Sequence, residues 1–210
     1  LVESDKQFRD NKIISFGHTS SGGRPHAEAN TLENVHFKKN KIYTLYSTLE
    51  PCCHEGRDES CVSKILKSKK INRVIFSLID PDKRVNGKGK KILKKNNLEV
   101  KSGLLETQIK NLYQGYILNR KENRPKIILK LAITKDGYIT FEKGKRTKIT
   151  NLISDKYSDI LRSEVDAILV GANTVRIDNC ILKCKMTGLI NKSPIRIVLN
   201  RKLDLSTNSK

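Results

Sequence analysis

The chain has 210 residues, a formal net charge of +20 and 37% hydrophobic residues. This length accommodates one large domain or two small ones, and no apolar run is long enough to span a membrane. No secretory signal is apparent either, so we expect a cytoplasmic protein without membrane partners. The basic residues are spread along the chain without interleaved aromatic residues, so we interpret the charge as composition and do not expect nucleic acid as a partner.

Strand and helix patterns alternate through the first part of the chain. Strand patterns occur at residues 13–16, 41–49, 74–79 and 98–101. Helix patterns occur at residues 26–37, 61–70, 87–96 and 104–119. This alternation predicts a largely parallel sheet with helices on both faces, a three-layer α/β/α domain whose site lies beyond the strand ends.

A second α/β domain is expected after a polar segment that Pro125 interrupts. We place the boundary so that the domains are residues 1–122 and 123–210. Three further strand patterns occur, at residues 126–133, 167–170 and 195–199. Asp136-Gly137 is typical of a hairpin turn, and Ser154 is expected to cap a helix that ends near Ser163.

The strongest chemical signal is His26-Ala27-Glu28, followed by Pro51-Cys52 and by Cys61. One imidazole and two thiolates can hold a tetrahedral zinc ion and leave the fourth position for water. The ion lowers the pKa of that water, and Glu28 is then the base that passes its proton to a leaving amine. An odd cysteine count, five, also argues for metal ligation and against disulfides. The sequence therefore predicts a zinc-dependent deaminase.

The loop between Cys52 and Cys61 is longer than the Cys-x-x-Cys of common nucleobase and nucleoside deaminases. It presents His54 and Arg57, which suit a ligand that carries a phosphate group. The loop therefore favours a phosphorylated small molecule as the substrate.

These motifs resemble those of the bifunctional riboflavin-biosynthesis deaminase–reductases. The resemblance rests on segments 22–28, 48–52 and 85–89, on Asp80-Pro81, and on later segments that include 129–132, 166–168 and 193–199. It implies a cytidine-deaminase-like domain, lacking its N-terminal helix, and then an incomplete dihydrofolate-reductase-like domain, so we expect a chain that is cut at both ends.

The resemblance also implies an activity. The first domain would catalyse zinc-dependent hydrolytic deamination of 2,5-diamino-6-(5-phosphoribosylamino)pyrimidin-4(3H)-one in riboflavin biosynthesis. In the full-length protein, the second would use NADPH to reduce the ribosyl group of the product to ribityl. We expect the reductase to be non-functional in this chain, and the family-level expectation for the assembly is a homodimer or homotetramer.

Residue roles follow from the resemblance position by position. It implies zinc ligands at His26, Cys52 and Cys61, a proton shuttle at Glu28, and substrate-binding residues at His54, Arg57 and Asp80. In the second domain it implies cofactor or substrate contacts at Lys130, Thr150, Arg162, Asp178 and Lys185. The sequence departs from the family at two positions. The family usually has Asn at the position of Asp82 and Arg at the position of Lys185.

Two other functions stay open. One is another zinc deaminase, acting on cytidine, dCMP or tRNA adenosine, which the long cysteine loop and the second domain disfavour. The other is a basic nucleic-acid-binding module with a structural zinc, which would show an affinity that falls steeply with salt.

Overall fold

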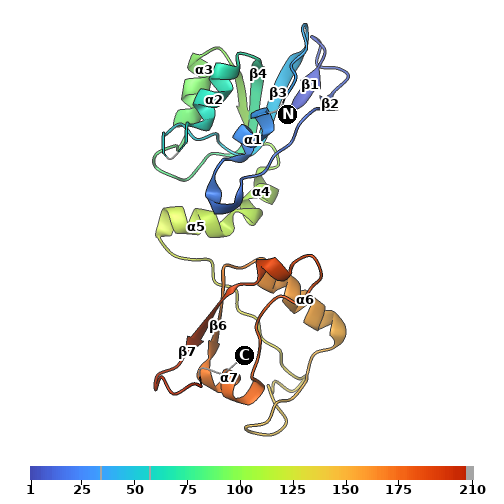
Figure 1. Ribbon diagram of the computed structural model, residues 1–210, viewed down its shortest axis with the longest axis vertical. Coiled ribbons are helices and arrows are strands. Elements are labelled where there is room, and N and C mark those ends of the chain that lie inside the picture. The colour runs from blue at the N-terminus through green and yellow to red at the C-terminus, as the bar shows by residue number, and fades with distance from the viewer. Residues whose placement is uncertain (34, 57, 207–210) are drawn as a thin grey trace. The chain divides into compact units, whose positions relative to one another are not determined.

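The computed structural model describes residues 1–33, 35–56 and 58–206. The chain divides into two compact units, Leu1–Ile127 and Ile128–Lys210. Each unit is described by itself, with its elements labelled in Figure 1. The expected boundary between functional domains at residues 122 and 123 stays a prediction.

The first unit is built on a five-stranded sheet with the order β2-β1-β3-β4-β5. Its strands are β1 (Val2–Ser4), β2 (Lys12–Ile13), β3 (Ile42–Leu49), β4 (Ile71–Leu78) and β5 (Glu99–Ser102). The three strands β3, β4 and β5 run parallel, whereas β1 pairs antiparallel with β2 and with β3. The predicted parallel centre of the sheet is thus confirmed, and the short strand β1 was not predicted.

Three helices line one face of this sheet. They are α1 (Ala27–Glu33), α2 (Cys61–Ser68) and α3 (Lys88–Lys95), and each contacts the next (Figure 1). Val62 and Ile65 of α2 are buried against Leu45, Val74 and Phe76 of the sheet. Apolar residues at this helical spacing meet alternating apolar residues of the strands, which is why α2 packs flat on the central pair of strands.

The other face of the sheet is only partly covered. Helices α4 (Glu106–Leu112) and α5 (Gln114–Glu122) follow β5, and the Tyr113 hydroxyl between them lies 2.8 Å from Thr48 Oγ1 near the end of β3. Further along the same face, Tyr46 keeps 45% of its surface exposed. A single helix over residues 104–119 was wrong, because Tyr113 leaves helical geometry (φ −92°, ψ 10°) and ends α4.

The second unit contains a two-stranded parallel sheet of β6 (Ala167–Gly171) and β7 (Ile195–Leu199). Its helices are α6 (Leu152–Ser163) and α7 (Ala172–Asp178), and short 3-10 turns occur at Ser21–Gly23 in the first unit and Ile190–Lys192 in the second. The strands predicted at 167–170 and 195–199 are confirmed. In the part of the chain that the structure describes, no helix could cross a membrane.

Three details beyond residue 125 differ from the sequence expectation. No strand forms over residues 126–133, where Ile127 and Leu129 are 82% and 89% exposed, because no neighbouring strand among the described residues pairs with them. The cap of α6 is Asn151, whose side chain accepts a hydrogen bond from Ser154 N (2.9 Å), so Ser154 lies inside the helix. Gly137 does lie in a tight turn, and no strands flank it.

Candidate metal centre and active site

His26, Cys52 and Cys61 come together although they lie far apart in the sequence. The sulfur atoms of both cysteines lie 3.4 Å from His26 Nδ1, and the three ligand atoms are all within 4.8 Å of one another. A tetrahedral zinc ion with ordinary Zn–S and Zn–N bonds holds nitrogen and sulfur about 3.5 Å apart. The donor types and their spacing therefore fit zinc.

Each ligand lies at the end of an element. His26 directly precedes α1, Cys52 follows β3 after Pro51, and Cys61 is the first residue of α2. Ser60 caps α2 by accepting a hydrogen bond from Ser63 N, which fixes the first turn that carries Cys61. The positive end of the helix dipole favours a thiolate at this position.

The two cysteine side chains shift each other's pKa in opposite directions. The hydrogen bond from Cys61 lowers the pKa of Cys52 to about 5. The same hydrogen bond, together with burial, raises the pKa of Cys61. A metal ion that binds both sulfur atoms must displace the proton of Cys61, so affinity for the metal falls at low pH.

Glu28 is buried beside the cluster without belonging to it. Its Oε2 atom lies 3.5 Å from Cys61 Sγ, and the residue as a whole is 9% exposed. Burial raises the pKa of Glu28. A carboxyl group with a raised pKa, next to the metal ligands, is suited to accept a proton and to return it.

Glu50, which the sequence analysis did not single out, ties the start of the cysteine loop to the segment that contains residues 80–90. Its buried carboxylate accepts hydrogen bonds from the backbone amides of Gly87 and Lys90, both 2.8 Å, and of Asp80 (3.3 Å). The start of α3 approaches so closely that a Cβ atom on Gly89 would lie 2.4 Å from Pro51 O. The position of Glu50, directly before Pro51-Cys52, was the available sequence signal.

Two of the three expected substrate-binding residues are described. The Nδ1 atom of His54 is buried and has no hydrogen-bond partner among the described residues, so it is available to a ligand. Asp80 is buried, and burial raises the pKa of its carboxyl group. The third expected residue, Arg57, lies outside the described residues.

Helix α5 holds the turn that contains Asp80. The Tyr116 hydroxyl donates a hydrogen bond to Asp80 Oδ1 (2.8 Å), and Arg120 lies 3.7 Å from Asp82 Oδ2. Sequence reasoning missed both residues of α5. Their spacing of four residues on one helix was a signal, but their partners lie more than thirty positions earlier in the chain.

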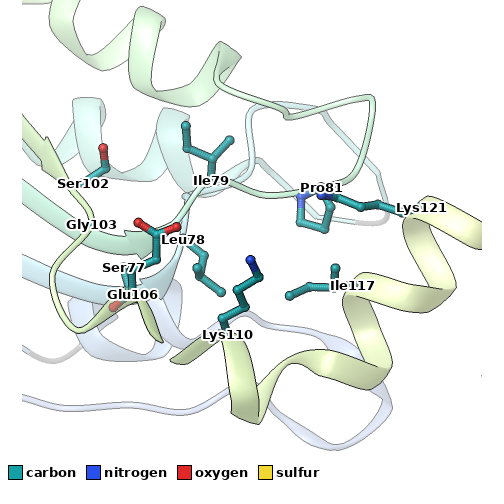
Figure 2. A pocket seen from close by; sticks show the side chains of 10 residues that line it. All are labelled: Ser77, Leu78, Ile79, Pro81, Ser102, Gly103, Glu106, Lys110, Ile117 and Lys121. Atoms are coloured by element: carbon teal, nitrogen blue, oxygen red, sulfur yellow. The ribbon is translucent and has the colours of Figure 1, made fainter. Parts of the chain in front are cut away.

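A cavity of about 260 Å³ lies between the ends of β4 and β5 and the helices α4 and α5 (Figure 2). Figure 2 shows the side chain of Lys110 reaching into it from α4, with Ile117 of α5 beside it. Pro81, the neighbour of Asp80, forms part of its wall, but none of the three zinc ligands does. The cavity is therefore separate from the metal cluster.

The expected reductase residues are scattered through the second unit. Thr150 donates a hydrogen bond to Asp155 (2.7 Å), and this bond and the contact of Asp155 with Lys148 lower the pKa of Asp155, with the charge of Lys130 as a weaker cause. Arg162 pairs with Asp159, which leaves its guanidinium engaged within α6. Asp178 ends α7, and Lys185 lies in an irregular segment after it. Among the described residues, no hydrogen bond or ion pair joins any two of the five expected residues.

Both parts of the chain match families of known proteins. Residues 7–78 match the family model of the cytidine and deoxycytidylate deaminase zinc-binding region, and residues 125–210 match the RibD C-terminal domain. The riboflavin biosynthesis protein RibD of Aquifex aeolicus is 36% identical over 202 residues, which cover 96% of this chain and 56% of that protein. The chain is a homologue of RibD.

Other RibD proteins give the same result. RibD of Synechocystis is 35% identical over 92% of this chain and 52% of its own length, so the chain spans about half the length of the curated relatives it matches. The structure of Acinetobacter baumannii RibD matches with a TM-score of 0.86 at 30% identity, covering 100% of this chain and 58% of that one.

A solved Thermotoga maritima protein, a diaminohydroxyphosphoribosylaminopyrimidine deaminase/5-amino-6-(5-phosphoribosylamino)uracil reductase, matches with a TM-score of 0.81 at 32% identity over 98% of this chain and 57% of that one. The expected order, a cytidine-deaminase-like domain followed by part of a RibD reductase domain, is confirmed. The zinc cluster lies within the matched zinc-binding region.

Proposed function

We propose that the first unit is a zinc-dependent deaminase that acts on 2,5-diamino-6-(5-phosphoribosylamino)pyrimidin-4(3H)-one. The observation that carries this proposal is the cluster of His26, Cys52 and Cys61 with the buried carboxyl group of Glu28 against it. Three ligands and one adjacent proton carrier are the parts that hydrolytic deamination of an aromatic amine needs.

The chain's own residues have separate tasks in this reaction. His26, Cys52 and Cys61 hold the zinc, which when bound supplies Lewis-acid activation of water near neutral pH. Glu28 accepts a proton from the attacking water and delivers it to the amino group, which leaves as ammonia. One water is consumed, one ammonia is released, and Glu28 returns to its starting state.

The substrate class is supported by the groups that surround the cluster. His54 offers a buried ring nitrogen with no partner among the described residues, and Asp80 is a buried carboxyl group held in a fixed turn. Groups of this kind can form hydrogen bonds with the polar edge of a heterocycle. The Thermotoga maritima structure, with its deaminase–reductase name, supports the same substrate class.

For the full-length protein we propose a second activity, the NADPH-dependent reduction of the ribosyl group of the deaminated product to ribityl. The match of residues 125–210 to the RibD C-terminal domain supports it. Lys130, Thr150, Arg162, Asp178 and Lys185 are its proposed contact residues, the protein is proposed to act in the cytoplasm, and the proposed assembly is a homodimer or homotetramer.

The test is ammonia release by the zinc-loaded chain from three compounds: the diaminopyrimidine phosphoribosyl substrate, cytidine and adenosine. We expect release from the first compound alone. Glu28→Gln keeps the size of the side chain and removes its ability to carry the proton, so we expect turnover to fall by about 10²–10⁴-fold. Release from cytidine or adenosine instead would contradict the proposed substrate, and full turnover by Glu28→Gln would contradict the proposed mechanism.

A further inference from the structure

Two arginine side chains converge on one buried carboxylate beside the candidate active site. Arg84 donates to Asp82 through Nε (3.0 Å to Oδ1) and Nη2 (2.7 Å to Oδ2), a two-point contact. Arg120 of α5 approaches the same Oδ2 atom at 3.7 Å. Within this group of three side chains, two positive charges share the single negative charge of Asp82, and Asp80 is a further acidic neighbour of Arg84.

This group of Asp82, Arg84 and Arg120, here called the arginine clamp, borders the zinc cluster. The backbone oxygen of Arg84 accepts a contact from Cys53 Sγ at 3.6 Å, directly after the ligand Cys52. The next residue, Val85, is fully buried against Cys52 and Cys61. Arg84 therefore lies on the loop that closes one side of the metal centre, and Arg120 reaches the same carboxylate from α5.

The clamp is also held in place before any ligand arrives. Arg120 lies over the ring of Tyr116 at 5.4 Å, and Tyr116 in turn donates a hydrogen bond to Asp80. Asp82 Oδ1 accepts from the backbone amide of Arg84 at 2.9 Å as well. Fixing both guanidinium groups in advance reduces the entropy that a ligand would otherwise lose in ordering them.

Both guanidinium groups remain open to solvent on their outer side. The side chains of Arg84 and Arg120 are 58% and 43% exposed, while that of Asp82 is 9% exposed. Arg84 uses Nε and Nη2 on Asp82, so its Nη1 group has no hydrogen-bond partner among the described residues. A planar guanidinium with free donors is the side chain best suited to a phosphate.

We propose that Arg84 and Arg120 bind the phosphate group of the phosphoribosyl substrate, with Asp82 orienting both guanidinium groups. This inference rests on the proposed deaminase function, and it adds a specificity site for the phosphate that lies outside the cysteine loop. The excess positive charge of the clamp matches a phosphate monoester, whereas an uncharged nucleoside gains nothing from it.

The first experiment measures binding of ribose 5-phosphate and of ribose by titration calorimetry. Removing both arginine side chains would leave Asp82 buried without a positively charged partner, so the variant tested is Asp82→Asn/Arg84→Gln/Arg120→Gln. We expect it to bind ribose 5-phosphate about tenfold or more weakly than the unaltered chain, since each lost hydrogen bond is to a charged group. Arg124→Gln, which removes an exposed arginine paired with Glu122, is the matched control and should bind as the unaltered chain does.

The second experiment compares KM for the phosphorylated substrate with KM for its dephosphorylated riboside. The triple variant should raise KM for the phosphorylated compound alone and should keep its zinc content. Equal affinity for ribose 5-phosphate in variant and unaltered chain, or an equal rise of KM for both compounds, would overturn the phosphate assignment. Absence of turnover by the unaltered chain would instead overturn the proposed deaminase function. The titration with ribose 5-phosphate would then still show whether the arginine clamp binds a phosphate group.

Discussion

Asp82 shows how one acidic side chain is stabilised next to a metal centre. Hydrogen bonds from Arg84, with burial opposing them, hold the pKa of Asp82 well below its usual range, and Arg120 adds to this. A carboxyl group whose pKa is lower in the folded state stabilises the fold while it is ionised in both states. That contribution is present above about pH 4, the pKa in an unfolded chain, and is lost as the pH falls toward the folded pKa.

We therefore predict that Asp82→Asn destabilises the first unit at pH 7 by about 1–3 kcal/mol, because charge-assisted hydrogen bonds are lost. The difference from the unaltered chain should shrink as the pH falls below about 4. Urea unfolding at several pH values measures it, and effects common to both proteins, such as loss of metal, cancel in the difference. A difference that stays the same from pH 7 to pH 3 would contradict this account.

At the scale of single residues, what the sequence could predict depended on distance along the chain. His26 and Glu28 are neighbours in one motif, and Cys52 follows a recognisable strand, so their cluster was predictable. Tyr116 and Arg120 were not, because their roles arise only when α5 packs against the turn after β4. Such side-chain contacts follow from tertiary packing, and the spacing of the two residues on one helix does not reveal their partners.

At the scale of elements, the close approach of α3 to the cysteine loop is the critical contact. A Cβ atom at Gly89 would lie 2.4 Å from Pro51 O, well inside normal contact, and 3.3 Å from Glu50 Oε1. By contrast, a Cβ atom at Gly115 of α5 meets nothing nearer than Lys126 Cβ at 3.8 Å. Two glycines in helices thus differ sharply in the space around them.

This contrast gives a paired prediction. Gly89→Ala should lower the free energy of unfolding of the first unit by about 1–3 kcal/mol, since the added methyl forces α3 away from the loop. Gly115→Ala, the matched control, should be neutral or raise it by up to about 1 kcal/mol through better helix propensity. Thermal unfolding of both variants measures the effect, and equal stability of the two would show that the close approach is not a constraint.

The element predictions failed where a partner was needed. Residues 126–133 have the apolar pattern of a strand, but a strand exists only when another pairs with it. Residues 104–119 have helical periodicity throughout, yet the contact of Tyr113 with Thr48 coincides with a break between α4 and α5. Helices α1, α2 and α3 were predictable because their own periodicity matches the sheet face they cover.

At the scale of the whole molecule, the two units differ in how much apolar surface they bury. Val74 and Phe76 at the centre of the first sheet are fully buried, whereas Leu169, Ile195 and Leu199 in the second are 56%, 70% and 61% exposed. A two-stranded sheet with exposed apolar side chains has little burial to offset its loss of chain entropy. The second unit is therefore expected to be much less stable by itself.

Hydrogen exchange measures this difference directly. We predict that backbone amides of β6 and β7 exchange orders of magnitude faster than those of β3 and β4, because local stability follows local burial. Protection of β6 and β7 equal to that of β3 and β4 would contradict the expectation, and would mean that other parts of the protein or its assembly cover the second sheet.

His26, Cys52 and Cys61 are proposed to hold one zinc ion, and the most direct test of this is the zinc content of the purified protein. We predict one zinc per unaltered chain and the same content in Glu28→Gln, since Glu28 lies outside the ligand cluster. Cys61→Ser should lose the metal, whereas Cys180→Ser, the same change at a cysteine outside the cluster, should keep it. An unaltered chain without zinc, or a Cys61→Ser variant that keeps its full complement, would contradict the account.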